Sequence, residues 1–224
     1  MPLKFTFTGK DPEGYVVKHF EAPLVHHRCR AHDVDGTRCE RQTSLGLDYC
    51  WQHLQLQQLK LKKEKNYGLG VIAENPRRGK AALLFKKHQP IVEYNGQHIS
   101  PDTLKERYGG FTAPYALGGF ESHVFDPKTK RVRKIKLKGQ DAATHRGIGA
   151  MFNHAKGKKA NAYFGAMPAR TQPAHAKQTK YVVGLIADRD IRNHEFLHVD
   201  YGPVYNLNRE GALKGSRSTH RTGY

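Results

Sequence analysis

The chain has 224 residues and carries 38 Lys and Arg against 20 Asp and Glu, which gives a formal net charge of +18. This length fits one domain of ordinary size with a small additional module, and the absence of any run of about twenty apolar residues excludes a membrane-spanning helix. The charge indicates a polyanionic partner such as DNA, RNA, a nucleosome or an anionic membrane face.

Residues 1–25 are expected to form a small N-terminal hairpin. Residues 3–8 alternate apolar and polar side chains, as a half-buried strand does. Residues 11–14 are typical of a turn, and residues 15–20 are predicted to be the returning strand. The start of the chain lacks the long apolar segment of a signal peptide. We therefore expect a nuclear protein, in a host nucleus if it is viral, with the cytoplasm as the alternative and no secretion.

All three cysteines of the chain fall in one short region, residues 26–65. They are Cys29, Cys39 and Cys50, and His53 follows closely. Three thiolates and one imidazole form a normal closed set for structural zinc, and an odd cysteine count is poor material for a disulfide framework. The segment has few large apolar residues, so it would hardly fold without a metal. The sequence therefore predicts a bound Zn²⁺, with three buried free thiols as the alternative. The fourth ligand could instead be His26, His27 or His32.

The end of this region, residues 51–65, contains no Gly or Pro and is rich in Leu, Gln and Lys. These residue types are good helix formers. We therefore expect a helix that links the zinc module to the main domain. Its lysines fit either a solvated face or a contact with nucleic acid.

The following region is predicted to be mostly β with short helices. We expect strands at residues 91–96, 181–191 and 196–201, a brief helix at 104–108, and a long hairpin formed by 115–125 and 131–138. In the second arm of the hairpin Val132, Ile135 and Leu137 alternate with basic residues, so one face can pack while the other carries cations. The cationic face fits a protected sheet edge, a nucleic-acid rim or a nuclear-import signal.

Residues 151–161, M-F-N-H-A-K-G-K-K-A-N, carry the most informative polar side chains. Asn153 and His154 directly follow two apolar residues, and Asn161 follows a short Gly/Lys loop. Asn offers an amide donor and a carbonyl acceptor, and His offers two ring nitrogens. This set is suited to holding a polar small molecule at the edge of a core. The alternative is an Asx-turn that ends a helix.

Several short motifs occur in an order and spacing that resembles the SET-domain protein lysine methyltransferases, over roughly residues 67–205. They are Gly68-Leu69-Gly70, Glu93-Tyr94-Asn95-Gly96, Arg107-Tyr108-Gly109, Tyr115-Ala116-Leu117, Asp141-Ala142, Arg146-Gly147-Ile148-Gly149, Asn153-His154, Asn161-Ala162 and Asp200-Tyr201-Gly202-Pro203-Val204-Tyr205. The Cys-rich segment also resembles, loosely, small zinc motifs of large-DNA-virus proteins. The chain therefore divides into the hairpin at 1–25, the zinc module and linker helix at 26–65, a SET-like domain at 66–205 and a basic tail at 206–224.

The resemblance implies a SET-type β-fold in which the segment at Asn153 and the segment at Asp200 form a knot-like crossing. Such threading is rare in proteins. It also implies S-adenosylmethionine as the cosubstrate, with a pocket formed by Gly68, Leu69, Gly70, Tyr108, Asn153 and His154. The catalytic residues would be Tyr201, with its hydroxyl at the methyl-transfer centre, and Tyr115, which would line the lysine channel. The substrate channel would also include Phe164, Tyr205 and Asn161.

The chain departs from the family pattern in two places. The loop between His154 and Asn161 is two residues longer than usual and lacks a proline before Asn161, which affects the expected loop geometry. No cysteine follows Cys50, so a C-terminal zinc cluster cannot close the lysine channel, and Tyr205 or Tyr224 would do so instead.

The sequence thus predicts a protein-lysine N-methyltransferase with a small zinc module and no membrane partner. A histone within chromatin is the expected substrate, because a free basic tail would be repelled by the +18 charge whereas nucleosomal DNA would be attracted. The alternatives are a methyltransferase of a non-histone protein and an inactive SET-like protein that binds chromatin or nucleic acid.

Overall fold

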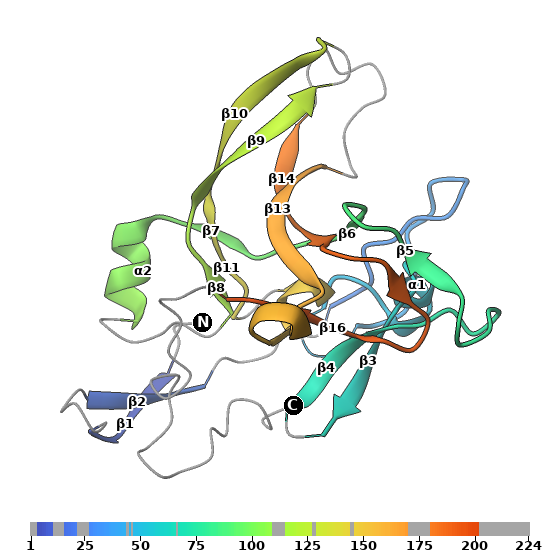
Figure 1. The fold of residues 1–224 in the computed structure, drawn as a ribbon. Helices are drawn as coiled ribbons and strands as arrows, with labels where there is room; N and C mark the ends of the chain where they lie inside the picture. Colours follow the sequence, from blue (N-terminus) through green and yellow to red (C-terminus); the bar gives the residue numbers. More distant parts are fainter. Residues whose placement is uncertain are drawn as a thin grey trace.

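The computed structural model describes residues 4–10, 16–21, 27–43, 45, 47–65, 67–108, 115–126, 129–143, 146–169 and 180–201. In these parts the chain is mostly β, with two short α-helices, as the sequence predicts (Figure 1). No helix within them has the length and apolar character needed to cross a membrane.

The central sheet has the strand order β3-β4-β16-β13-β14-β6, and the short strand β12 also pairs with β16. Neighbouring strands are antiparallel, except that β12 and β13 each meet β16 in parallel. The bounds are β3 Leu59–Glu64, β4 Gly68–Ala73, β6 Pro90–Glu93, β12 Asn153–His154, β13 Ala162–Pro168, β14 Tyr181–Ala187 and β16 Phe196–Val199. This topology places the residues around Asn153 directly beside the end of β16.

Smaller sheets surround the central one (Figure 1). Strand β5 (Leu83–Phe85) pairs with β15 (Ile191–Arg192), and β11 (Gly139–Asp141) lies between β7 (Gln97–Ile99) and β8 (Ala116–Leu117). The predicted N-terminal hairpin is present as β1 (Lys4–Lys10) and β2 (Val16–Glu21), and the long hairpin as β9 (Phe120–Asp126) and β10 (Arg131–Leu137). The remaining elements are α1 (Trp51–Leu56), α2 (Pro101–Tyr108), η1 (Ile148–Met151) and η2 (Gly157–Lys159).

One hydrophobic core joins the zinc module to the sheet. Leu47 and Leu54, which flank the last cysteine, are buried in the same cluster as Leu59 of β3 and Leu197 of β16. Burial of a Leu side chain contributes roughly 1.5–3 kcal/mol, so this contact is a substantial part of what holds the module in place.

The helix predicted over residues 51–65 is wrong in its second half. Helix α1 ends at Leu56, Gln58 takes a left-handed φ of 60°, and β3 begins at Leu59. In L-K-L-K-K-E, Leu59 is buried and Leu61 is half-buried while Lys60 and Lys62 are exposed, which is the two-residue period of a strand. Pairing with β4 therefore overrides the helix propensity of these residues.

The β9–β10 hairpin also differs in one detail. Ile135 and Leu137 face inward as expected, but Val132 lies on the lysine face and is 65% exposed. Val132 is an odd number of residues from both, so a strand puts it on the opposite side.

Candidate active site and metal centre

The three cysteines and His53 converge on one point. Their ligand atoms all lie within 4.8 Å of one another, and the three thiols are buried. The Nδ1 atom of His53 is 3.2 Å from Cys50 Sγ and 3.6 Å from Cys29 Sγ. In a tetrahedral zinc site an S–N separation of about 3.6 Å follows from the metal–ligand bond lengths, so the donor set fits zinc in both type and spacing.

Local structure accounts for this convergence. Bridges between Arg28 and Gln42 and between His32 and Arg38 fold residues 28–42 back on themselves, which brings Cys29 and Cys39 together. Cys50 directly precedes α1, and the first turn of that helix brings His53 back beside it.

His27 and His32, two of the alternative fourth ligands, do not belong to the cluster of Cys29, Cys39, Cys50 and His53. His27 places Nδ1 at 3.1 Å from the carbonyl of Arg28, and His32 is exposed. His26 lies outside the described residues.

The surroundings of the cysteines act on their pKa values in opposite directions. Burial raises the pKa of the Cys29 thiol, whereas the backbone N–H of Arg41 lowers the pKa of Cys39 by hydrogen bonding. A hydrogen bond to sulfur favours the thiolate, which is the form that binds metals.

A second polar cluster lies where β12 runs beside β16. The Glu64 carboxylate accepts one hydrogen bond from Asn153 Nδ2 at 2.9 Å, and its other oxygen lies 2.8 Å from His198 Nε2. Glu64 and His198 have side chains that are only 12% and 15% exposed. The ring of Tyr67 lies 5.5 Å from that of His198. Glu64 and His198 were not among the residues predicted from the sequence, because nothing local to either one indicates the other.

Gly70 of β4 lies against this cluster. A Cβ at this position would be 2.5 Å from Asn153 Nδ2 and 3.2 Å from a Glu64 oxygen, so a larger residue would displace the Asn153 side chain. Gly68, two residues earlier, has a φ of +84°, a backbone conformation that favours glycine. Leu69 lies between them and packs against the core. The predicted Gly68–Gly70 segment is therefore brought next to Asn153.

His154 and Tyr201 meet on the other side of β12. His154 Nδ1 accepts a hydrogen bond from the backbone N–H of Tyr201 at 3.1 Å, and the two rings lie 5.1 Å apart. An accepting nitrogen carries no proton, so we favour this bond over an ion pair with Asp200, whose oxygen is 4.0 Å away. The Tyr201 hydroxyl donates to the carbonyl of Phe152 at 2.5 Å.

Asn161 fixes the position of β16. Its Nδ2 donates to the carbonyl of Phe196 at 2.8 Å, its Oδ1 accepts the N–H of His198 at 2.8 Å, and its own N–H donates to the His198 carbonyl at 3.0 Å. The side chain is 1% exposed. In the structure this residue therefore supports the site from inside the protein, and the longer loop before it does not prevent this contact.

The predicted channel residues Tyr115 and Phe164 are connected through Tyr94. The Tyr94 hydroxyl donates to the Tyr115 carbonyl at 2.6 Å, and its ring packs edge-on against Phe164 with centroids 5.7 Å apart. Tyr115 has a φ of 59°, and the buried guanidinium of Arg146 lies 4.1 Å from its ring centroid. A tyrosine held in a left-handed conformation by neighbours on both sides is typical of functional positions.

Two predicted site residues cannot be placed. The Tyr108 side chain and Tyr205 lie outside the described residues, as does the segment after Tyr201 that would complete a knot-like crossing.

Comparison with solved structures finds SET-domain methyltransferases, the family that the sequence motifs resemble. The chain is similar to the Neurospora SET domain protein DIM-5, a histone lysine methyltransferase, with 18% identity and a TM-score of 0.42 over 65% of this chain and 52% of that one. It is similar to the methyltransferase domain of human histone-lysine N-methyltransferase SETMAR, with 21% identity and a TM-score of 0.43 over 68% and 46% of the two chains.

A third similar structure is ctPRC2 in an autoinhibited conformation bound to S-adenosylmethionine, with 20% identity and a TM-score of 0.41 over 64% of this chain and 15% of that one. The alignments thus span about half, or less, of the length of these solved chains. No protein-family model and no curated protein sequence matches the chain.

Proposed function

We propose that this protein is an S-adenosylmethionine-dependent protein-lysine N-methyltransferase. The observation that carries the proposal is the parallel contact of β12 with β16, which gathers Asn153, His154 and Tyr201 with Glu64 and the Gly68–Gly70 segment. The sequence motifs assign these residues to a methyl donor pocket and a transfer centre, except for Glu64, which no motif includes.

The chain's own residues fit such a donor. The absence of a side chain at Gly70 lets Asn153 and Glu64 lie directly against the backbone of β4. Asn153 uses its amide nitrogen on Glu64, and its Oδ1 has no partner among the described residues. A carbonyl oxygen presented in this way suits a positively charged amino group. S-adenosylmethionine, when bound, supplies an activated methyl group on a sulfonium.

The protein must align the lysine and favour its neutral form. A free lysine has a pKa near 10.4 and is almost entirely protonated at neutral pH. Desolvation and a nearby positive charge both lower that pKa, and tyrosine and phenylalanine side chains provide an apolar channel for this purpose. Alignment of two reactants supplies on the order of 7–11 kcal/mol. Tyr115 and Phe164, connected through Tyr94, are suited to this role.

Tyr201 is suited to the transfer centre. Its hydroxyl donates to the Phe152 carbonyl, which fixes the position of the phenol; in the proposed reaction its oxygen would lie beside the methyl group that is transferred. Lone pairs directed at a developing positive charge stabilise it, and a fixed group does so without reorganisation.

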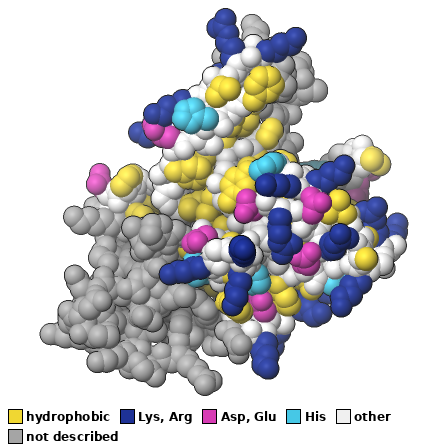
Figure 2. Space-filling view, in the orientation of Figure 1, with side chains coloured by type: hydrophobic (Ala, Val, Ile, Leu, Met, Phe, Trp, Pro, Cys, Tyr) yellow, Lys and Arg dark blue, Asp and Glu magenta, His cyan; other side chains and the backbone are white. Residues whose placement is uncertain are grey.

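The proposed substrate is a histone within chromatin. The net charge of +18 attracts DNA and repels free basic peptides. Figure 2 shows Lys and Arg side chains over much of the described surface in that view, with acidic side chains interspersed. We propose that zinc bound by Cys29, Cys39, Cys50 and His53 is structural, because four protein ligands leave no open position.

The test is methyl transfer from labelled S-adenosylmethionine to free core histones and to nucleosomes, with wild type beside Tyr201→Phe and the site located by mass spectrometry. Transfer to nucleosomes that is lost in the variant supports the proposal. Cofactor binding without transfer to either substrate indicates a non-histone target. Absence of cofactor binding overturns the enzyme assignment and leaves a basic binding protein.

A further inference from the structure

A groove of about 1060 Å³ lies away from the Asn153–Tyr201 site, between the zinc module, helix α1 and the turn after β4. Its lining includes the α1 residues Trp51, Gln52, Gln55 and Leu56, the module residue Arg41 and the turn residue Arg77. The proposed methyl transfer uses none of these side chains.

The α1 wall of the groove exposes large apolar side chains without any partner among the described residues. Trp51 is 62% exposed and Leu56 is 78% exposed. One exposed apolar side chain is ordinary, but two large ones that line the same groove are what a partner-binding surface provides. Gln52 and Gln55 lie on the same helix and provide amide donors and acceptors beside the ring.

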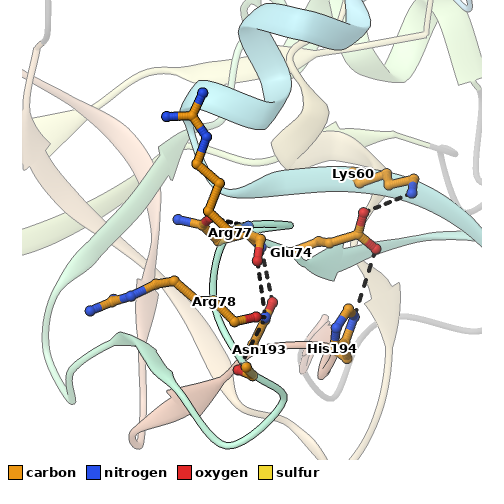
Figure 3. Close-up of polar contacts among 8 residues, drawn as sticks. Lys60, Glu74, Arg77, Arg78, Asn193 and His194 are labelled. Carbon is orange, nitrogen blue, oxygen red and sulfur yellow. Dashed lines mark hydrogen bonds and ion pairs between the residues drawn. The ribbon is translucent and has the colours of Figure 1, made fainter.

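The turn that carries Arg77 is held rigidly. Buried Asn193 accepts the N–H of Asn75 at 2.9 Å and donates to the carbonyls of Asn75 and Arg78 at 3.1 and 2.7 Å. Figure 3 shows the Arg77 side chain extending away from Asn193 and Glu74. Among the described residues its guanidinium makes no hydrogen bond or ion pair. Because the backbone of this turn is already ordered, only the Arg77 side chain has to become ordered when it binds an anion.

We propose that this groove binds a single-stranded segment of nucleic acid, with an unstacked base against Trp51 and phosphates at Arg77 and Arg41. Three arginines and two carboxylates line the groove, namely Arg38, Arg41, Arg77, Asp33 and Glu40. The Arg38 guanidinium donates to the backbone carbonyls of Cys29 and Arg28, and Arg41 donates to Cys39 Sγ at 3.9 Å. Arg77 and the +18 charge of the whole chain are therefore what favour a polyanion. An aromatic face with flanking cations is how proteins bind single strands without sequence preference. Bases in a duplex are already stacked and would not reach the ring.

Trp51 is the only tryptophan of the chain, so its fluorescence reports on the groove alone. We would titrate the full, zinc-loaded protein with a short oligothymidylate, a duplex of equal length and poly-glutamate. We expect saturable quenching by the single strand that weakens steeply between about 50 and 200 mM salt. Quenching by the duplex as strong as by the single strand, or quenching by poly-glutamate alone, overturns the proposal, and the second result indicates an acidic protein partner instead.

Variants test the two contacts separately, with binding followed by anisotropy of a labelled oligothymidylate. Trp51→Ala is expected to weaken binding about tenfold, within the range for loss of one stacked base. Arg77→Gln keeps the fluorescent reporter and should reduce the slope of log affinity against log salt by about 0.7. Lys87→Gln, an exposed lysine outside the groove, is the matched control and should change neither quantity. Wild-type affinity in Trp51→Ala, with zinc content intact, overturns the proposal.

Discussion

Glu64 and Asn153 are 89 residues apart in the sequence, yet the Glu64 carboxylate accepts a hydrogen bond from the Asn153 side-chain amide at 2.9 Å. An ionised carboxylate can only accept, so it selects the orientation in which Asn153 turns its nitrogen inward and its carbonyl oxygen outward. His198 Nε2, at 2.8 Å from the second carboxylate oxygen, restrains Glu64 from the other side. The sheet order β3-β4-β16 thereby controls how a residue of β12 is presented to a ligand.

Replacement of Glu64 by Gln should weaken cofactor binding more than it slows methyl transfer. A neutral amide can donate as well as accept, so Asn153 loses its preferred orientation and the charge-assisted bond. Hydrogen bonds to charged groups contribute about 1.5–3 kcal/mol, so we expect the Kd for S-adenosylmethionine to rise by about ten- to a hundredfold, with kcat at saturating cofactor nearly unchanged. Calorimetry and steady-state kinetics measure the two effects. Glu121→Gln, at an exposed position of β9, is the control.

An unchanged cofactor affinity in Glu64→Gln, in a protein with wild-type thermal stability, would contradict this role for Glu64. A fall in kcat alone would also contradict it, because Glu64 would then act at the transfer step rather than on Asn153.

Replacement of Gly70 by Ala should disturb the same cluster through sterics. The new Cβ would lie 2.5 Å from Asn153 Nδ2, so Asn153 has to move. Overpacking of this kind typically costs about 1–3 kcal/mol, and we expect both a lower melting temperature and weaker cofactor binding. Gly79→Ala is a matched control, since its Cβ would meet no atom within 4 Å. Equal effects of the two substitutions would contradict the prediction that contact with Asn153 requires a glycine at position 70.

The residues of the site that could be predicted from the sequence are those whose chemistry shows in a local pattern. Asn153 and His154 follow two apolar residues, and the three cysteines with His53 form a compact ligand set. In the structure the three cysteines and His53 form one cluster. Asn153 and His154 form a separate site beside β16.

Glu64 and His198 could not be found in this way, because each acts through a partner that is distant in the sequence. Tyr94 stands in one of the motifs, but its contacts with Tyr115 and Phe164 could not be predicted for the same reason. Glu64 stands among lysines in L-K-L-K-K-E, where an acidic residue is ordinarily part of a solvated face. The same stretch was expected to be helical, which would have separated Glu64 from Asn153. Only pairing with β4 reveals that its period is that of a strand.

Replacement of Asn161 by Ala should destabilise the whole domain. Its side chain makes hydrogen bonds to two part-buried backbone groups of β16, and their loss would leave both groups without that partner. Each such loss costs about 1–3 kcal/mol, so we expect the free energy of unfolding to fall by about 2–6 kcal/mol. Denaturant titration followed by circular dichroism measures the change. Asn75→Ala, at a half-buried position on the turn that carries Arg77, should cost less, and a smaller effect of Asn161→Ala would contradict its role as the support of β16.

Removal of the metal should unfold the module and loosen the main core with it. The module has only isolated bridges and one helical turn around the thiols and His53 in its described part, and metal-binding energy in small modules is folding energy. Leu47 and Leu54 belong to the same buried cluster as Leu59 and Leu197, so their release also removes apolar contacts from the sheet. We expect one zinc per chain, loss of zinc in Cys39→Ser and His53→Ala, and a lower melting temperature after chelation. Trp51, directly after Cys50, should report the change by fluorescence.

Zinc retained in His53→Ala but lost in His27→Ala would contradict the ligand set. A melting temperature unaffected by chelation would contradict the coupling to the core.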